Sequence, residues 1–386
     1  MDKLRIGLIG CGEIAVREHL PAWAEARNAE VVAICDVNVD HAREQATRFD
    51  VKQVHTDYQE LLERADVDAV DICLPHDLHG PVGIDAAKAG KHILVEKPIT
   101  LTLEEAVELI DACERARVKL MVGHIMRFTP QIRFMKQVID SGILGKITHV
   151  ASRCFLLKNI LVQAESKNQP WKISKAGSGG GAIHRDGIHH LDILRWFCGS
   201  EVMRVTAEVD NFIWEQEVES CGHILMRFRN RAIGELVTNY CTVHPGYGEM
   251  TVTGTTGTVR IGGGRWTEPQ MFGLAPTPVE IFANELGTRA NALNDLLEAT
   301  NAAGSGYSQV RPESLVVQVP AGRAPRTLLA EHFVDCARDG LEPLTNGLES
   351  AKALEVIIGA YRAAEQGSSV DLPLFPLDRL YERGEG

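Results

Sequence analysis

The apolar positions of the first 120 or so residues alternate between short continuous runs and helical spacing. This alternation predicts short buried strands joined by amphipathic helices, and therefore a doubly wound parallel sheet. Thr102 and Glu105 form a capping-box pattern, and Pro81 and Gly90 suit the start and the end of an earlier helix. The predicted strands are Leu4–Ile9, Glu30–Cys35, Ala69–Leu74, Lys91–Val95 and Lys119–Val122.

After about Gly123 the pattern changes to long runs in which apolar and polar residues alternate. A period of two predicts strands with one buried face, and hence a mainly antiparallel sheet. The stretch Gly262–Arg326 is rich in Gly, Pro and Ala around a helical piece, Asn284–Ala302, and we expect it to be an irregular excursion. A last amphipathic helix is predicted over Gly347–Gln366. The alternating runs are Val202–Phe212, His223–Phe228, Ala232–Thr242 and Met250–Thr253, with turn signals at Arg229–Arg231 and Gly254–Gly257.

Two domains follow from these patterns, and the length of 386 residues suits that number. We expect an α/β domain over residues 1–123 and an α+β domain over residues 124–386. The second domain would be an open, mostly antiparallel sheet with helices on one face. The uncovered face of such a sheet commonly receives a partner, so a homodimer or a homotetramer is expected rather than a monomer.

The composition favours small molecules as partners. A formal net charge of −12 disfavours nucleic acid and anionic membranes. The chain has nine scattered cysteines and no C-x-x-C pair, which indicates thiols in a reducing compartment. The first motif begins after only Met1–Lys3, and no apolar run approaches the roughly 20 residues of a membrane span. We therefore expect a cytoplasmic protein.

A glycine fingerprint follows the first predicted strand. The G-x-G-x-x-A spacing predicts a tight turn at Gly10, close approach of a pyrophosphate at Gly12 and tight packing of helix against strand at Ala15. The backbone of Glu13 and Ile14 would share this cofactor contact. Asp36 ends the next strand, where a carboxylate accepts hydrogen bonds from the adenosine ribose and repels a 2′-phosphate. NAD is therefore the expected cofactor, and NADP is less favoured.

The tetrapeptide Val95–Pro98 ends another predicted strand and contains a lysine beside a carboxylate, Glu96-Lys97. At the carboxyl end of a parallel sheet, an ammonium group so placed lies at the edge of the ligand crevice. The alternative interpretation is a turn with a solvated charge pair, which contributes little to stability.

Three further segments carry a family resemblance. They are Cys73–His79, Gly123–Pro130 and the run from the triple glycine Gly179–Gly181 to Gly199. Together with the glycine fingerprint and Glu96-Lys97-Pro98, they strongly resemble the glucose-fructose oxidoreductase, inositol dehydrogenase and rhizopine catabolism family, Gfo/Idh/MocA. This resemblance implies an N-terminal Rossmann domain, a C-terminal open sheet that builds the substrate pocket, and NAD(P)-dependent redox chemistry on sugars, inositols or related polyols.

The resemblance also implies roles for individual residues. Lys97 would touch both the nicotinamide ribose and the reacting hydroxyl, and His189 would be the general acid/base. The position of the aspartate that supports the histidine in the family is occupied by Arg185, with Asp186 displaced by one residue. The residues expected to line the cofactor are Pro75, His79 and Glu96, together with His76, where the family usually carries asparagine.

The chemistry of these residues supports part of that assignment. The ordinary pKa of histidine suits proton transfer near neutral pH, and Asp192, three residues after His189, can reach its ring. A guanidinium cannot act as a base, so Arg185 is instead expected to bind a substrate carboxylate or phosphate through a bidentate pair of hydrogen bonds. In the alternative, Arg185 points away and Asp186 takes the supporting role.

Three weaker expectations complete the site. Arg127 is expected to line the pocket as a polar anchor and Trp171 as a stacking wall for a sugar ring, although such residues are more often an ion-pair member and a core residue. The crowding of histidine and aspartate around His189 also fits a metal, but no second cluster completes a ligand shell, so we expect none.

The function expected from these residues is an NAD(P)-dependent dehydrogenase. It would move a hydride between the nicotinamide and a secondary alcohol carbon of a sugar, sugar acid or cyclitol. Two alternatives stay open. One is a redox-neutral hydrolase or lyase that uses NAD transiently, and the other is a non-catalytic sensor of ligand and NAD on the same fold.

Overall fold

Six parallel strands form the first sheet of the computed structural model, which describes residues 3–64, 66–156, 169–212, 216–242, 247–264, 275–283, 307–311 and 314–383. The five predicted strands are all present, and the short strand β3 is additional. Their order places the end of β1 and the end of β4 where the winding of the chain reverses, which is where open α/β sheets bind ligands. In spatial order the strands are β3 (Gln53–His55), β2 (Ala29–Cys35), β1 (Leu4–Ile9), β4 (Ala69–Ile72), β5 (His92–Val95) and β6 (Leu120–Val122).

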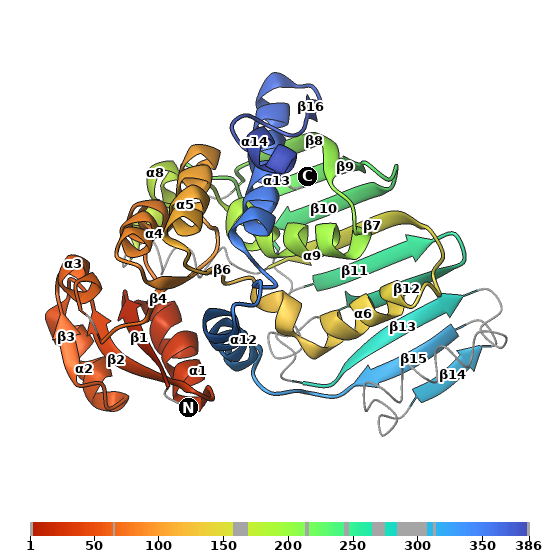
Figure 1. The fold of residues 1–386 in the computed structure, drawn as a ribbon. Helices are drawn as coiled ribbons and strands as arrows, with labels where there is room; N and C mark the ends of the chain where they lie inside the picture. The colour runs from red at the N-terminus through yellow and green to blue at the C-terminus, as the bar shows by residue number, and fades with distance from the viewer. Residues whose placement is uncertain are drawn as a thin grey trace.

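Helices connect these strands and flank the sheet (Figure 1). The capping box at Thr102 and Glu105 is confirmed, because each side chain bonds the backbone of the other residue at the start of α5. The helices are η1 (Ala15–His19), α1 (Leu20–Glu25), α2 (Val39–Arg48), α3 (Tyr58–Leu62), η2 (His76–Leu78), α4 (His79–Lys88) and α5 (Leu103–Ala116).

The second sheet has ten strands and is mixed. Its neighbours pair antiparallel except for β7 with β10, so the expected mostly antiparallel sheet is confirmed. In spatial order the strands are β14 (Tyr307–Arg311), β15 (Ser314–Val319), β13 (Thr277–Ala283), β12 (Gly257–Gly264), β11 (Tyr247–Gly254), β7 (Ile147–Phe155), β10 (Ile233–Asn239), β9 (Cys221–Phe228), β8 (Val202–Asp210) and β16 (Val370–Asp371).

We expected an irregular excursion over Gly262–Arg326. This prediction is wrong for the part of that stretch that the structure describes. Strands β13, β14 and β15 extend the sheet there instead. In β13 the residues at every second position, such as Val279 and Ile281, are buried, so the alternating pattern was present within a Gly- and Pro-rich stretch. The helical piece predicted over residues 284–302 lies outside the described residues.

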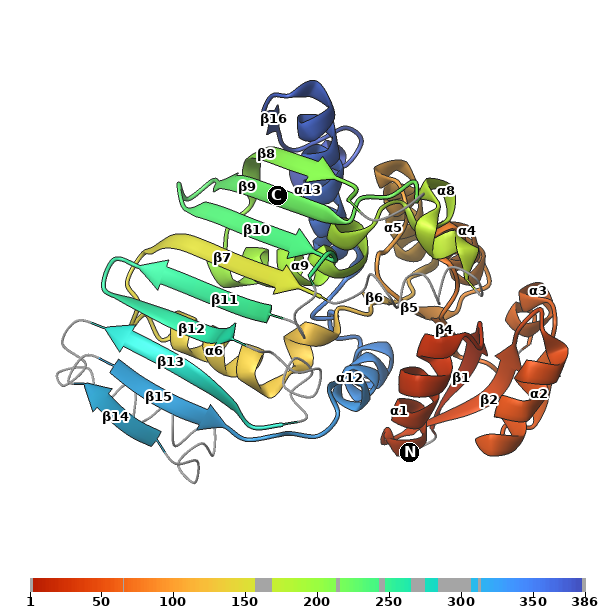
Figure 2. The ribbon, with the colours of Figure 1, turned by 180° about the vertical axis from the view of Figure 1, so that it is seen from behind.

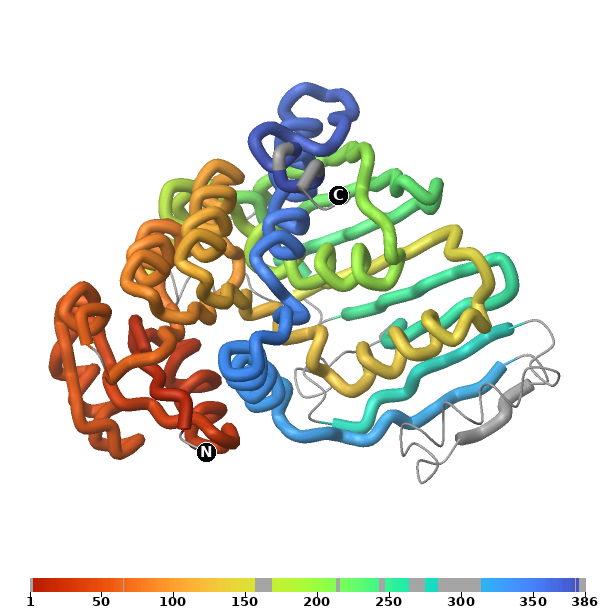
Figure 3. Tube along the Cα trace, viewed as in Figure 1, coloured from red at the N-terminus to blue at the C-terminus, as the bar shows by residue number. Residues whose placement is uncertain are grey.

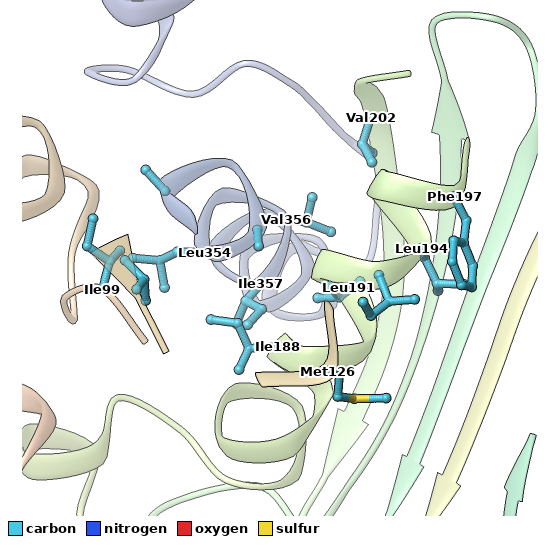
Figure 4. Close-up of a cluster of buried hydrophobic side chains, with 14 of the residues drawn as sticks. Ile99, Met126, Ile188, Leu191, Leu194, Phe197, Val202, Leu354, Val356 and Ile357 are labelled. Atoms are coloured by element: carbon cyan, nitrogen blue, oxygen red, sulfur yellow. The ribbon is translucent and has the colours of Figure 1, made fainter. Parts of the chain in front are cut away.

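Helices α6 (Pro130–Asp140), α9 (Ile188–Cys198) and α13 (Gly347–Gln366) cover one face of the large sheet, and the other face carries none among the described elements (Figure 2). Buried side chains of α9 and α13 pack on one another beside the sheet, as Leu191 and Ile357 illustrate (Figure 4). The helix predicted over Gly347–Gln366 is confirmed as α13. The described helices of the second half are η3 (Ile125–Phe128), α6 (Pro130–Asp140), η4 (Pro170–Ile173), α8 (Lys175–Ser178), η5 (Ile183–Gly187), α9 (Ile188–Cys198), α12 (Pro325–Asp339), α13 (Gly347–Gln366) and α14 (Asp378–Arg383).

Late in the chain, α12 returns to the first sheet (Figure 3). Leu329 and Phe333 of α12 are fully buried in one apolar cluster with Ile6 of β1 and Trp23 of α1. The segment after α12 also borders β6, where Val122 N donates to Thr345 O at 2.8 Å. The division into residues 1–123 and 124–386 stays a prediction, and the first sheet is covered in part by a helix from the second half.

All nine cysteines lie in the described residues and are free thiols. Seven of them are buried, as Cys73 is, and the other two are half-buried. In the part of the chain that the structure describes, none of the helices is both long and apolar enough to cross a bilayer.

Candidate active site

The glycine turn after β1 is held against β4 and leaves space in front of it. Gly10 has a φ of +94°, and a Cβ built there would lie 2.5 Å from the carbonyl oxygen of Cys73, so only glycine fits. A Cβ at Gly12 would meet nothing within 4 Å. The helix that follows begins without a side-chain cap on its first amide groups. This arrangement fits a pyrophosphate, which needs open space and backbone N–H donors at such a turn.

Asp36 lies at the end of β2 and fastens this turn. Its Oδ2 accepts a hydrogen bond from Cys11 N at 2.7 Å, and its Oδ1 accepts one from Asn38 N at 2.8 Å. Each carboxylate oxygen can accept a further bond, so the group remains suited to a ribose hydroxyl. Asp36 therefore fits the position that the sequence analysis assigned to it beside an adenosine ribose.

Lys97 spans from the end of β5 to the segment before α9. Its Nζ donates to the backbone carbonyl oxygen of Arg185, and its own backbone N–H donates to Glu96 Oε2 at 3.1 Å. The carboxylate of Glu96 is buried and is bonded to groups of the protein. The pair Glu96-Lys97 is thus not a solvated surface pair, because the carboxylate is buried and the ammonium group bonds the carbonyl of Arg185.

His189 lies in the first turn of α9, close to Lys97. Burial lowers the pKa of His189 well below its usual value, and the charge of Lys97 and the ring of His124 lower it further. Its ring centre is 6.2 Å from that of His124, with the planes at 90°. The ring is therefore neutral near pH 7, and its Nδ1 is buried without a partner in the part of the chain that the structure describes.

Asp192, expected to reach the ring of His189, is paired with Arg127 instead. Its Oδ2 accepts a hydrogen bond from Arg127 Nε at 2.8 Å, and its Oδ1 accepts one from Arg127 Nη2 at 2.7 Å. Arg127 also donates from Nη1 to Leu344 O at 2.9 Å, lies against the ring of Trp196 and is 2 % exposed. The guanidinium expected as a polar anchor is thus bound within the protein, below the site.

Asp186 and Arg185 lie between Lys97 and β10. Asp186 accepts a hydrogen bond from the hydroxyl of Tyr240, and its charge raises the pKa of His189 against the lowering effect of burial. The charge of Arg185 acts on Tyr240, since it lowers the pKa of that phenol. Both side chains therefore reach the region around Tyr240, and the structure brings Asp186 close enough to His189 to act on its charge.

The rings of His76, Trp171 and His184 form a cluster near the start of α4 and near α8, and this cluster is called the ring wall below. His76 donates from Nδ1 to Ser178 O at 3.0 Å, and its ring centre lies 4.9 Å from that of Trp171 and 6.0 Å from that of His184. Burial and then the Lys97 charge lower the pKa of His184 to about 3. Neutral rings therefore line this wall.

Two contacts attach that wall to the nucleotide side. His79 lies at the start of α4, four residues after Pro75. Its Nδ1 lies 2.7 Å from Pro98 O and its Nε2 lies 2.9 Å from Leu74 O. Lys172, which follows Trp171, has its Nζ 3.8 Å from Glu13 Oε2. The η4 segment consequently comes close to Glu13 of the glycine turn, and the role of Trp171 as a stacking wall stays a prediction.

Glu219 supports the triple glycine, and the sequence analysis missed it. Its Oε2 accepts from Gly181 N at 2.7 Å, its Oε1 accepts from Ile183 N at 2.8 Å, and Tyr361 donates its hydroxyl to Oε1 at 3.0 Å. A Cβ at Gly181 would lie 1.8 Å from Glu219 O. The glycine run was a signal that another backbone comes close, but nothing in the sequence indicated which one.

One grouping of possible metal ligands occurs in the described residues, at His19, Asp71 and Cys73. The two ring nitrogens of His19 already contact Asp71 and Glu96, at 2.7 and 2.9 Å, and Cys73 Sγ lies 3.7 Å from Asp71 Oδ1. These groups satisfy one another without an ion. The expected absence of a metal stays a prediction.

Comparison with known proteins gives two family matches. Residues 4–124 match a model described as an oxidoreductase family with an NAD-binding Rossmann fold, and residues 132–260 match the GFO/IDH/MocA C-terminal domain. A D-apiose dehydrogenase of Paraburkholderia graminis is 29 % identical over 376 residues, which cover 96 % of this chain and 90 % of that protein. Oxidoreductase ORF334 of Rhizobium meliloti is 35 % identical over 211 residues, which cover 54 % of this chain and 60 % of that protein.

Among solved structures, the WlbA dehydrogenase from Bordetella pertussis in complex with NADH and UDP-GlcNAcA is similar over nearly the whole chain. The TM-score is 0.78 at 26 % sequence identity, and the match covers 97 % of this chain and 99 % of that one.

Proposed function

The chain belongs to the Gfo/Idh/MocA family of NAD-binding oxidoreductases, and within it we propose an NAD-dependent dehydrogenase that acts on a secondary alcohol of a sugar, sugar acid or cyclitol. The observation that carries this proposal is the convergence of Lys97 and His189. The ammonium group bonds the segment just before α9, and its charge is a main cause of the lowered pKa of His189.

These two side chains divide the work on the reacting hydroxyl. His189 is neutral and half-buried, so its ring can accept the hydroxyl proton. Lys97 polarises the same oxygen and stabilises negative charge that develops on it. Bound NAD would supply the hydride acceptor. In the reverse direction, His189 returns the proton to the carbonyl oxygen.

Gly12 and Asp36 support the choice of NAD. The space in front of Gly12 suits the pyrophosphate, and the carboxylate at the end of β2 suits a ribose that carries free hydroxyls. A 2′-phosphate would meet this carboxylate at close range, and such a pair of like charges is unfavourable. Asp36 therefore favours NAD over NADP.

The substrate class rests on Arg185 and on the relatives. D-apiose dehydrogenase and the WlbA complex with UDP-GlcNAcA both point to carbohydrates as substrates. Arg185 accepts the Lys97 hydrogen bond at its backbone carbonyl, its side-chain charge acts on Tyr240, and a guanidinium binds carboxylates with two parallel hydrogen bonds. We include uronates and other carboxylated polyols in the proposed class for that reason.

A screen for NADH formation tests this proposal. The purified protein is incubated with NAD and panels of neutral sugars, inositols and uronates, and NADP is run in parallel. Formation of NADH with at least one panel, lost in His189→Gln, supports the proposal. Bound NAD that turns over a glycoside without net NADH would favour the redox-neutral hydrolase or lyase instead. Binding of NAD without any turnover would favour a sensor.

A homodimer or homotetramer through the uncovered face of the large sheet belongs to the same proposal. Light scattering on the eluted protein tests it, and a monomeric mass at working concentration would contradict it.

A further inference from the structure

A buried cluster of charged side chains lies behind Lys97, and the proposed chemistry does not use it. Its members come from four elements that are far apart in sequence. They are His19 of η1, Asp71 of β4, Glu96 at the end of β5 and Arg326 in the first turn of α12, and each is less than a tenth exposed.

Glu96 is the member that links this cluster to the site. Its Oε1 lies 2.9 Å from His19 Nε2 and 2.7 Å from Arg326 Nη1, while its Oε2 accepts the hydrogen bond from Lys97 N. One carboxylate thus contacts the helix of the glycine fingerprint, the helix that returns from the second half of the chain, and the backbone of the proposed catalytic lysine.

The remaining contacts close the cluster on itself. Asp71 Oδ2 accepts from Trp23 Nε1 at 2.6 Å and lies 2.7 Å from His19 Nδ1. Burial lowers the pKa of His19, but attraction to Asp71 more than offsets this, and the ring lies between the two carboxylates. Each buried carboxylate thus has a basic partner, which is the condition under which buried charges are tolerated.

Gly123 allows Arg326 to approach Glu96. A Cβ built at Gly123 would lie 2.9 Å from Glu96 Oε1 and 3.3 Å from Arg326 Nη1. No other residue type leaves this space, because every other side chain begins with that carbon. The glycine at the end of β6 therefore serves the ion pair.

We propose that Arg326 is a positioning residue for Lys97, because its guanidinium holds the Glu96 carboxylate in place behind the lysine. This inference rests on the proposed function. Arg326 lies beyond residue 260, where the family match ends. Its Nε and Nη1 make no hydrogen bond to the described residues, so the contact with Glu96 is a charge pair rather than an aligned fork.

The electrostatics of Glu96 agree with this role. Burial raises the pKa of Glu96, but Arg326, as the next largest influence, and then His19 bring that pKa well below its usual value. Without Arg326 the burial effect is opposed mainly by His19 and Lys97. The charged and titratable groups that face Glu96 are His19, Asp71, Cys73, His79, Lys97, His124, His189 and Arg326.

Arg326→Met tests the inference, with Arg326→Lys as the conservative variant and Arg323→Met as the matched control. Arg323 lies three residues earlier, is half exposed and pairs with Glu331 instead. We expect kcat/KM for NAD to fall about 100-fold in Arg326→Met, since a misplacement of about 1 Å can have that effect. A new loss of activity toward acid pH should appear as Glu96 takes up a proton. Arg326→Lys should restore part of both, and Arg323→Met should change neither.

Two further measurements keep the outcome decisive. Gly123→Ala displaces the same ion pair without removing a charge, so it should lower kcat/KM in the same direction even if Arg326→Met does not fold. NAD affinity, measured directly by titration across the same pH range, tests the inference even if no sugar is oxidised and the proposed function fails. The inference is overturned if Arg326→Met and Gly123→Ala lose thermal stability but keep the wild-type pH profile, kcat/KM and NAD affinity.

Discussion

Lys97 donates from Nζ to the backbone carbonyl oxygen of Arg185, so the strand end of the first sheet and the segment before α9 meet at one ammonium group. This bond positions the lysine beside His189. It also means that the lysine can be tested apart from the fold, because a single side-chain hydrogen bond contributes only about 0.5–1.5 kcal/mol to stability.

Replacing Lys97 by Met should remove polarisation of the substrate oxygen and keep the stem that packs in the crevice. We expect kcat to fall by about 10²–10³-fold, as when one donor to a developing oxyanion is lost. The midpoint of thermal unfolding should change little. Lys88→Met, at an exposed lysine of α4, is the control. A variant at Lys97 that retained the wild-type kcat would contradict the assignment.

The pH dependence should reflect the lowered pKa of His189. Burial, the Lys97 charge and His124 all lower its pKa, so the neutral ring exists above that lowered value and is lost only as the pH falls through it. We therefore expect kcat for alcohol oxidation not to decline at about pH 6.5, the ordinary histidine value. In an NMR titration, the imidazole signal that disappears in His189→Gln should titrate below the ordinary histidine value of about 6.5.

The lowered pKa of His189 also predicts how the stability of the fold depends on pH. The unfolded chain binds a proton at this histidine below about pH 6.5, whereas the folded chain does not, so the free energy of unfolding should decrease as the pH falls below that value. Urea unfolding of wild type and His189→Gln at several pH values measures the difference. A steeper pH dependence in the variant would show that the sign is wrong.

Arg185→Gln should discriminate between substrates. Charged hydrogen bonds contribute about 1.5–3 kcal/mol, which corresponds to roughly a 10- to 100-fold loss of kcat/KM for uronates. Neutral sugars and inositols have no carboxylate to lose, so their turnover should stay close to wild type. If turnover of all substrates were nearly unchanged, Arg185 would not bind a carboxylate, and Asp186 would be the residue of interest.

Asp36→Asn should relax the cofactor preference. The amide oxygen can still accept the bond from Cys11 N, so the glycine turn is retained while the negative charge is removed. We expect the ratio of kcat/KM for NADP to that for NAD to rise at least about tenfold, because a like-charge contact of several kcal/mol is relieved. Equal use of both cofactors by the wild-type protein would refute the role given to Asp36.

Glu219→Ala should destabilise the protein, because the amides of Gly181 and Ile183 lose a buried acceptor. Each buried donor left without a partner costs about 1–3 kcal/mol, so we expect a decrease of roughly 2–5 kcal/mol in the free energy of unfolding, measured in urea. Glu217→Ala, at an exposed residue that accepts from Lys175 N, should change it by less than about 1 kcal/mol.

Local sequence patterns predicted the fold well where apolar runs and amphipathic periods are long and regular. Strand β1 and helix α13 have the predicted bounds, because a continuous apolar run and a long amphipathic period are unambiguous. Strands β13 and β15 were missed, since the glycines and prolines around them suggested turns. Their pairing depends on neighbours in the sheet, which no local window contains.

Within the site, only the residues that belong to local sequence motifs could be predicted from the sequence. Spacing on a helix put Asp192 within reach of His189, but it could not show that Arg127, 65 residues earlier in the chain, takes both carboxylate oxygens. Likewise, Glu96 was noted for its motif, whereas its partner Arg326 carries no local signal. Long-range ion pairs of this kind follow from topology rather than from sequence pattern.

The return of α12 to the first sheet also has a consequence for synthesis. The apolar surface formed by Ile6 and Trp23 is completed by Leu329 and Phe333, more than 300 residues later in the chain. At a translation rate of about 5–20 residues per second, this surface waits roughly 15–60 s for its cover. We therefore expect the emerging N-terminal half to expose this apolar surface, and nascent chains stalled before residue 325 should bind chaperones that recognise apolar segments.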